Sequence, residues 1–453
     1  MAITTLASPP LPSVERRPAL PAGFVAGGTT AGIKASGRPD LALIVATGGP
    51  AAAAAVFTPN AFAAAPVKQS RANLAATSDD PRGGFGFASA VISTSGCANA
   101  ATGAAGDADQ EAVGRLVAGA CGIDERHVLH LSTGIIGTRL PLDRVEAGVG
   151  NLYSALSGDD AGLRAAAEAL RTTDSVLKAA TTTLVLPAAD GEPVTVTITG
   201  IAKGVGMIHP NMATMLSVVL TDAAAAPEVL WSVLRPAAAR TWDQLSVDGD
   251  SSTNDTVFVM ASGTAANAAL AAGSHGAMAF QSALEAVARD LARQQAADGE
   301  GATILITASV TGAVDDADAR AVARAVISSS LVKAAAHGKD PNWGRIAGAA
   351  GNATTASAAV LEAAGLAPDA AAARASQPAQ LDPDRLRIAI AGHLVFDGSQ
   401  GGPLDFDRAA ARAAMDAAEL LIELDLGLGD GIGEAFGCDL TQEYVIENSE
   451  YTT

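Results

Sequence analysis

The feature that most constrains the fold is an alternation between short runs rich in leucine or β-branched residues and longer stretches rich in alanine. The short runs predict strands at residues 41–46, 128–131, 194–198, 303–310 and 386–390. The alanine-rich stretches predict helices at 108–121, 278–297 and 317–336. Strands that alternate with helices indicate a mixed α/β protein, although periodicity does not decide whether its sheets are parallel or antiparallel.

Capping signals support the helix over residues 108–121. Asp107 stands where a side chain could cap the start, Gln110 follows three residues later, and Gly122 stands just past the end. Two other segments show less order in their composition. We expect residues 1–20, which are rich in proline, to form a flexible arm, and residues 353–383 to form a helix with a variable surface excursion.

Composition excludes several classes of partner. The 453 residues suffice for two or three structural units with large cores, which must be aliphatic because only 4% of the residues are aromatic. A formal net charge of −19 repels nucleic acid and anionic lipid, so we expect neither as a partner. No long apolar run and no secretory signal are visible, which predicts a cytoplasmic protein.

The sequence offers no pattern typical of a metal site or a disulfide framework. The cysteines Cys97, Cys121 and Cys438 are widely spaced and odd in number. Residues 248–255 suggest a calcium loop, but Thr253 and Val259 stand where such a loop needs glycine and glutamate. We therefore expect no metal.

Three turns concentrate glycine and hydroxyl residues. One dense run, residues 200–216, lies between the predicted strand 194–198 and an apolar continuation. Residues 93–103 and 132–137 also follow apolar runs, and they present hydroxyls and free backbone N–H groups that can bind an anion or an oxyanion. Taken alone, the first run fits a functional site and a structural loop equally well.

Long motifs occur in order along nearly the whole chain: GIKASGRPDLALIV, AAVFTPNAFAAAPV, STGIIGTRLP, TTDS, AKGVGMIHPNMATML, SVDGDSSTNDTV, LVKAAAHGKDPNWGRI and GCDLTQEYVIENSEYTT. In order and spacing they resemble the bifunctional glutamate N-acetyltransferase and ornithine acetyltransferase family of the arginine pathway. The ATML and GDSSTNDT blocks are the most specific. The resemblance implies a layered α-β-β-α sandwich of the self-processing type, with a smaller C-terminal α/β portion.

The resemblance also implies that the precursor cleaves itself between Ala213 and Thr214. The products would be an α chain, residues 21–213 preceded by the arm, and a β chain, residues 214–453, that begins with the nucleophile. A threonine hydroxyl is a weak nucleophile, and the new α-amino group, with a reference pKa of about 7.7–8.0, supplies a base beside it. The alternative is that Thr214 is only the first residue of a buried strand.

By the same resemblance, Thr214 takes acetyl from N-acetylornithine and passes it to glutamate in a ping-pong cycle. Thr133 and Gly134 would form the oxyanion hole, and Lys203 would bind the α-carboxylate that both substrates carry. The structural alternative for Thr133 and Gly134 is an ordinary strand-to-turn junction. The alternative for Lys203 is a solvated surface lysine.

Further substrate contacts carry over less evenly. Thr173 is favoured over its neighbour Thr172, and Asn448 and Thr453 match the family's C-terminal pair. Many members carry glutamate in the block where this chain has Lys339, which replaces a carboxylate by a cation. Either Asp340 or another acid takes over the substrate contact of the family glutamate, or this chain lacks that contact.

The resemblance implies no cofactor, and acetyl-CoA stays open as a second acetyl donor. It also implies an assembly with at least two α and two β chains. Other functions remain as alternatives: a related self-cleaving amidohydrolase or aminopeptidase, an acyltransferase for another N-acyl amino acid, and a binding protein that never processes.

Overall fold

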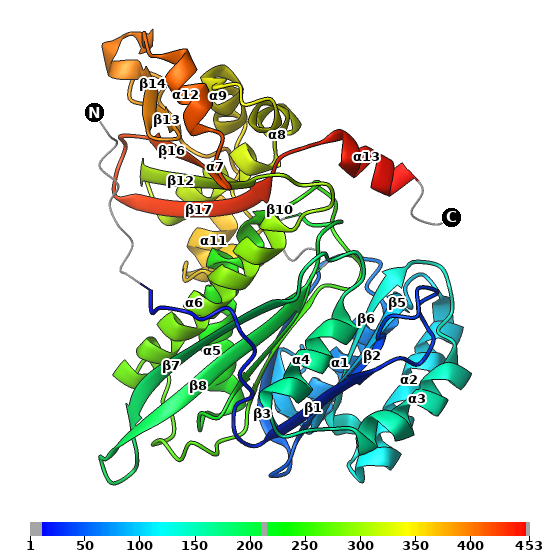
Figure 1. Ribbon diagram of the computed structural model, residues 1–453. Helices are drawn as coiled ribbons and strands as arrows, with labels where there is room; N and C mark the ends of the chain where they lie inside the picture. The colour runs from blue at the N-terminus through cyan, green and yellow to red at the C-terminus, as the bar shows by residue number, and fades with distance from the viewer. Residues whose placement is uncertain (1–10, 210–214, 450–453) are drawn as a thin grey trace.

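Two β-sheets pack face to face in the computed structural model, which describes residues 11–209 and 215–449 (Figure 1). The smaller sheet contains, in order, β1 (Phe24–Thr29), β2 (Leu41–Ala46), β5 (Ala90–Cys97) and β6 (Val128–Ile135). The larger contains β4 (Phe85–Ala88), β3 (Ala51–Phe57), β11 (Thr256–Ala261), β9 (Leu216–Thr221), β8 (Pro193–Lys203) and β7 (Lys178–Pro187).

Helices cover the outer faces of both sheets. The smaller sheet packs on α2 (Gly103–Cys121) and α3 (Leu142–Ser154), and the larger packs on α5 (Pro227–Arg240) and α6 (His275–Ala297). Two further helices, α1 (Ala65–Ala76) and α4 (Asp160–Leu170), add side chains to the core between the sheets. The expected α-β-β-α layering is therefore confirmed.

This layering explains why the strands are continuous apolar runs. In β2, Ala42 and Ile44 face the opposite sheet, whereas Leu41 and Leu43 face α2 and α3. Every residue of the strand is buried, so the alternation of polar and apolar residues that marks a half-exposed strand is absent.

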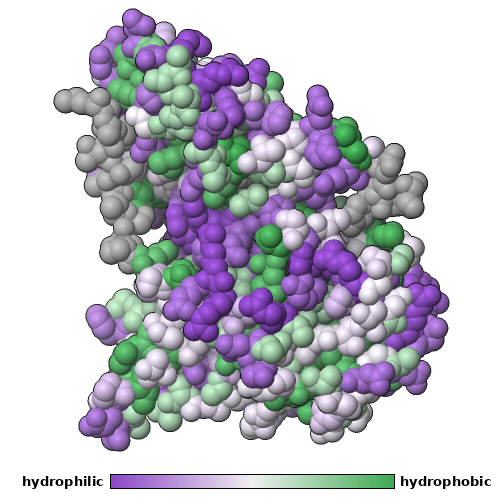
Figure 2. Space-filling view, in the orientation of Figure 1, coloured by the Kyte–Doolittle hydropathy of each residue, from purple (hydrophilic) through white to green (hydrophobic). Residues whose placement is uncertain are grey.

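The smaller C-terminal portion is built on a third, mixed sheet. Its strands are, in order, β10 (Leu245–Ser246), β17 (Gly431–Cys438), β12 (Leu305–Ala313), β16 (Glu419–Asp425), β13 (Arg387–Ile390), β14 (His393–Asp397) and β15 (Gly402–Pro403). Its core includes α7 (Asp316–Ser328), α8 (Ser330–His337) and α9 (Trp343–Gly351). Figure 2 shows hydrophilic side chains gathered across the middle of one face, between this portion and the sandwich.

Two predicted helix boundaries differ from the structure. The helix expected over 317–336 is two helices, because the Ser329 side chain accepts from the backbone N–H of Val332 and starts α8 there. The helix α2 begins at Gly103, so Asp107 lies inside it and pairs instead with Lys68, at 3.0 Å.

The two segments expected to be less ordered are better anchored than composition indicates. From Ser13 onward the arm is fixed to β7, where Glu15 and Thr181 exchange backbone hydrogen bonds of 2.8 and 2.9 Å. Residues 353–383 contain two short helices, α10 (Ala358–Ala363) and α11 (Pro368–Arg374), with a small core of their own. The remaining helices are α12 (Arg408–Ala414) and α13 (Gln442–Ser449). Among the described helices, none has the length and apolar character needed to cross a membrane.

Phe258 should be a main contributor to the core between the two sheets. Its side chain is fully buried and meets Phe57 edge to face, with ring centroids 6.0 Å apart. We expect Phe258→Ala to lower the free energy of unfolding by about 3–5 kcal/mol, measured by denaturant titration. The control, Phe62→Ala, removes a ring that is 70% exposed and should change it little; equal losses in both variants would contradict this packing.

Candidate active site

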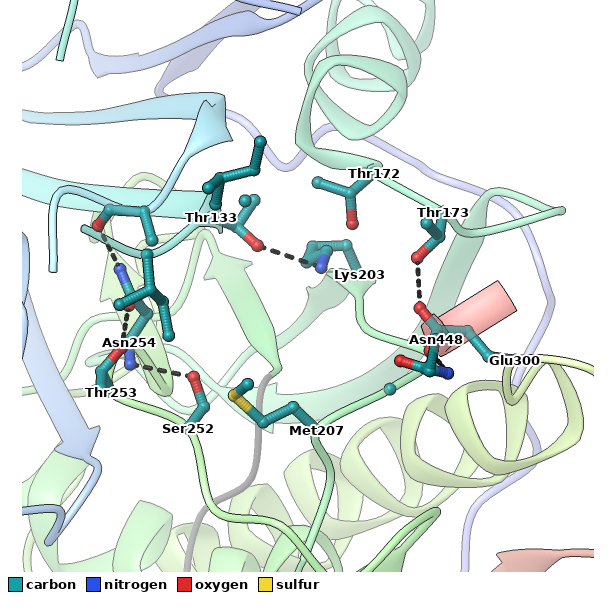
Figure 3. A pocket seen from close by; sticks show the side chains of 15 residues that line it. Thr133, Thr172, Thr173, Lys203, Met207, Ser252, Thr253, Asn254, Glu300 and Asn448 are labelled. Carbon is teal, nitrogen blue, oxygen red and sulfur yellow. Dashed lines mark hydrogen bonds between the residues drawn. The ribbon is translucent and has the colours of Figure 1, made fainter. Parts of the chain in front are cut away.

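A cavity of about 360 Å³ collects side chains from distant parts of the sequence (Figure 3). They come from the ends of β6 and β8, the turn after α4, the loop before β11, the turn after α6, and α13. The lining residues are Ala98, Thr133, Gly134, Ile135, Ile136, Thr172, Thr173, Lys203, Gly206, Met207, Ser252, Thr253, Asn254, Glu300 and Asn448. The cavity thus combines hydroxyls, a cation and a carboxylate in one site.

Gly134 marks a close approach between the parallel strands β5 and β6. Its φ is +130°, and a Cβ atom built there would lie 2.4 Å from the carbonyl carbon of Gly96. Only glycine fits this position, since any side chain would force the two strands apart. The turn at the end of β6 is therefore more than an ordinary junction, and it brings Thr133 and Gly134 to the cavity wall.

Lys203 is a buried cation at the end of β8. Its side chain is 3% exposed, and Nζ donates to Thr133 Oγ1 at 3.1 Å (Figure 3). Burial lowers the pKa of Lys203, and the nearby charge of Asp174 opposes that effect. A solvated surface lysine is therefore excluded.

Asp174 compensates two buried lysines. It accepts from Lys178 Nζ at 2.7 Å and from the backbone N–H of Gly204 at 2.8 Å. Burial alone would raise the pKa of Asp174, but the charges of Lys203 and Lys178 hold it well below its usual range. Asp298 completes the cluster with a 2.5 Å bond from Lys178.

Glu300 supplies the carboxylate of the cavity. Thr173 Oγ1 donates to Oε1 at 2.8 Å, and Asn448 Nδ2 donates to Oε2 at 3.0 Å (Figure 3). A Cβ atom at Gly206 would lie 2.3 Å from Oε2, so the glycine lets the carboxylate lie directly against the backbone. Sequence reasoning missed Glu300, although a glutamate between two glycines just past the predicted helix 278–297 was an available signal.

Two aspartates of the segment that resembled a calcium loop anchor the chain on either side of residues 210–214. Asp248 accepts from the backbone N–H of Met207 at 2.5 Å and from that of Ile208 at 2.9 Å. Asp255 Oδ1 accepts from the backbone N–H of Met215 at 3.0 Å. Burial raises the pKa of both carboxyls. The pKa of Asp255 is raised well above the usual range of an aspartate.

Asn254 joins the two sheets beside the cavity. Its Nδ2 donates to the carbonyl of Ala98 at 2.7 Å and to that of Ser132 at 2.9 Å. Its Oδ1 accepts from Thr253 Oγ1 at 2.6 Å. Both backbone acceptors belong to the oxyanion-type turns identified in the sequence, so Asn254 fixes them relative to β11.

Five of the predicted site residues line this one cavity. They are Thr133, Gly134, Thr173, Lys203 and Asn448. Thr172 lines it too, but Thr173 is the one that bonds to Glu300. The predicted cleavage residues Ala213 and Thr214, and the predicted contact Thr453, lie outside the described residues.

The structure does not bring Lys339 into the cavity. It follows α8 in the C-terminal portion, where its Nζ donates to Asp416 Oδ1 at 2.5 Å. Asp340, the suggested replacement for the family glutamate, accepts from Asn342 Nδ2 at 2.9 Å and does not line the cavity either. The acid found in the cavity is Glu300.

The arrangement suits a small ligand that carries charges of both signs. Lys203 can bind a carboxylate, and Glu300 can accept hydrogen bonds from an ammonium group. The hydroxyl of Thr133 and the backbone at Gly134 line the same cavity, where they could stabilise an oxyanion.

Comparison with known proteins gives a full-length match. A model of the ArgJ family matches residues 25–453. The arginine biosynthesis bifunctional protein ArgJ of Synechococcus is 43% identical, with 96% of each chain covered. The proteins of that name from Thermus thermophilus and Geobacillus stearothermophilus are 42% and 40% identical; each alignment covers 96% of this chain, and 99% and 95% of theirs respectively.

Two solved structures resemble parts of the chain. The crystal structure of the arginine biosynthesis bifunctional protein ArgJ from Bacillus halodurans is 37% identical, covers 50% of this chain and 95% of that chain, and gives a TM-score of 0.43. The ornithine acetyltransferase of Mycobacterium tuberculosis, solved with ornithine, is 40% identical, covers 44% and 97%, and gives a TM-score of 0.38.

Removing the Asp174 charge should destabilise the fold. We expect Asp174→Asn to lower the free energy of unfolding by about 3–5 kcal/mol at neutral pH, because two buried lysines lose a partner. Asp384→Asn, at an exposed aspartate, is the control.

The contribution of Asp174 to the free energy of unfolding should decrease as the pH falls. Because the folded pKa of Asp174 is depressed, its contribution is complete above its unfolded pKa of about 3.9 and is lost as pH falls toward the folded value. The stability gap between wild type and Asp174→Asn should therefore be constant above about pH 5 and narrow below about pH 4, as measured by urea titration at each pH. A gap independent of pH in the acid range would contradict the assignment.

Proposed function

The chain belongs to the ArgJ family of acetyltransferases in arginine biosynthesis, and from that premise we propose that it transfers acetyl from N2-acetyl-L-ornithine to L-glutamate. One observation carries the proposal: a single cavity holds both expected oxyanion donors, a buried lysine and a carboxylate. A donor with an α-carboxylate and a free side-chain ammonium group matches those charges.

Maturation is the first step of the proposed mechanism. The Thr214 hydroxyl attacks the carbonyl of Ala213, the peptide C–N bond breaks, and water then hydrolyses the resulting ester. The products are an α chain ending at Ala213 and a β chain whose N-terminal amine lies beside the Thr214 hydroxyl. The hydrogen bonds from the backbone flanking this segment to Asp248 and Asp255 support the proposal, because they restrain the chain on both sides of the cut.

The acetyl transfer then runs in two halves. Thr214 Oγ attacks the acetyl carbonyl of N-acetylornithine while its proton passes to the α-amino group of the same residue. The Thr133 hydroxyl and the Gly134 backbone N–H stabilise the tetrahedral oxyanion. The intermediate collapses, the amide C–N bond breaks, and ornithine leaves with the proton. The amine of glutamate repeats the sequence on the acetyl-threonine ester and restores the free hydroxyl.

Lys203 and Glu300 orient the donor in this proposal. Lys203 binds the α-carboxylate, and its bond to Thr133 couples that contact to the oxyanion hole. Glu300, held by Thr173 and Asn448, accepts from the ammonium group of the ornithine side chain. We further propose acetyl-CoA as a second donor, a cytoplasmic location and an assembly of two α and two β chains.

Substitution of the nucleophile tests both maturation and transfer. Thr214→Ala should remain one uncut chain by mass spectrometry and transfer no acetyl, because it lacks the attacking hydroxyl. Thr214→Ser keeps a hydroxyl and should retain both reactions in part. Incubating the wild type with N-acetylornithine, with and without glutamate, separates a transferase from a hydrolase, since only a transferase needs glutamate for turnover. If Thr214→Ala still splits and still transfers acetyl, the assignment fails.

Glu300 should affect substrate use without affecting maturation. We expect Glu300→Gln to lower kcat/KM for N-acetylornithine by about ten- to 150-fold, which corresponds to a lost charged hydrogen bond of roughly 1.5–3 kcal/mol. The cut before residue 214 should persist. Glu192→Gln, at an exposed glutamate in the β7–β8 turn, is the matched control. Unchanged kcat/KM in Glu300→Gln would remove Glu300 from the proposed donor site.

A further inference from the structure

A second and larger cavity, of about 960 Å³, lies beside the helices of the C-terminal portion. It is lined mainly by α7, α9 and the stretch between α9 and α10. His209 lines this cavity and Met207 lines the first, so the two sites lie two residues apart along one strand-to-loop segment. None of the proposed catalytic steps uses this second cavity.

Two arginines that form no ion pair among the described residues give this cavity a positive charge. Arg324 and Arg345 both line the cavity, and neither forms an ion pair with a carboxylate among the described residues. Their hydrogen bonds go to backbone carbonyls, from Arg324 to Thr354 at 3.3 Å and from Arg345 to Leu331 at 2.8 Å. No aspartate or glutamate of the described chain lines the cavity.

The described lining of the cavity thus carries two cations and no carboxylate, although the chain has a net charge of −19. One turn before Arg324 on the same helix, Arg320 pairs with Asp316 at 3.8 Å. Arg324 is half-buried, and desolvation lowers its pKa to about 10 against the opposing charge of Asp243, so it keeps its charge at neutral pH. Two guanidinium groups that share one cavity and form no ion pair among the described residues make it a favourable place for an anion.

The rest of the lining favours a phosphate group as that anion. Ser328 and Ser357 line the same cavity, and Ser328 Oγ is buried without a hydrogen-bond partner among the described atoms. The Thr355 hydroxyl, also in the lining, bonds to the backbone carbonyls of Arg374 and Gln377. Gly344 and Gly348 form another part of the wall, where a ligand can approach the backbone of α9 closely. Planar guanidinium groups with nearby hydroxyl donors match the oxygens of a phosphate.

We propose that this second cavity is a binding site for a phosphate-bearing ligand, held by Arg324 and Arg345. Its volume lies in the range of pockets that accommodate whole cofactors and drug-sized molecules, about 300–1,000 Å³, so the site has room for more than free phosphate. The phosphorylated end of acetyl-CoA is one source of that chemistry, and this identification alone rests on the proposed function. Inorganic phosphate or pyrophosphate is the other source.

Calorimetric titration of the full, processed protein tests the site without requiring turnover. Acetyl-CoA and inorganic pyrophosphate are titrated separately into wild type, Arg324→Gln, Arg345→Gln and the control Arg412→Gln. Arg412 is an exposed arginine of α12 without an ion pair among the described residues, so its loss makes the same change of charge elsewhere. We expect both ligands to bind the wild type and the control equally, and both cavity variants to weaken binding by about tenfold or more. Added salt should weaken the wild-type affinity.

The outcomes separate the two sources. Arginine-dependent binding of pyrophosphate without binding of acetyl-CoA supports the phosphate site and rejects acetyl-CoA as its ligand. If neither ligand binds, or if Arg345→Gln binds as the wild type does, the site is rejected. Because Arg324 is half-buried, its replacement could disturb the fold. Thermal unfolding of its variant and the charge-conserving Arg324→Lys show whether weak binding reflects misfolding. If acetyl-CoA is the ligand, Arg345→Gln should raise its KM more than that of N-acetylornithine.

Discussion

The active-site cavity depends on one buried electrostatic cluster, in which Asp174 compensates Lys178 and Lys203. The two lysines begin β7 and end β8, and both are buried. Asp174 therefore links the turn after α4 to both strands, and its bond to the Gly204 N–H fixes the backbone where β8 leaves the sheet. The charge of Asp174 opposes the effect of burial on the pKa of Lys203 and so favours the charged lysine beside Thr133.

Two glycines shape the cavity, because each lets a neighbouring group lie against the backbone. Gly134 lies against the Gly96 backbone, and Gly206 lies against the Glu300 carboxylate. At each position the absence of a Cβ atom lets a neighbouring group come close to the backbone. Asn254 then holds both turns of the smaller sheet against the larger one through the Ala98 and Ser132 carbonyls. The positions of the polar groups in the cavity are therefore set by how the backbone segments pack against one another.

Local patterns predicted much of the fold, and long-range contacts account for what they missed. Residues 41–46 form a strand over exactly the predicted span, because a strand buried on both faces leaves an uninterrupted apolar run. The burial of Lys203 could not be inferred from its neighbours in sequence, since its partners Asp174 and Thr133 lie far away along the chain. For Glu300 a local signal was available, the glycines on either side of it, but its partners Thr173 and Asn448 lie far away along the chain. The resemblance brought Thr133, Thr173 and Asn448 into one hypothesis, and their common cavity is a property of the three-dimensional fold.

The strand order of the larger sheet has a consequence for any cut between residues 213 and 214. The pairs β4–β3 and β8–β7 precede that point, whereas β11 and β9 follow it and lie between them. The two polypeptides would interleave within one sheet, with β9 antiparallel to β8 and β11 antiparallel to β3. Their separation would break backbone ladders on both sides and open the cores on both faces of the sheet. The fragments would remain mutually dependent, and neither could keep this architecture alone.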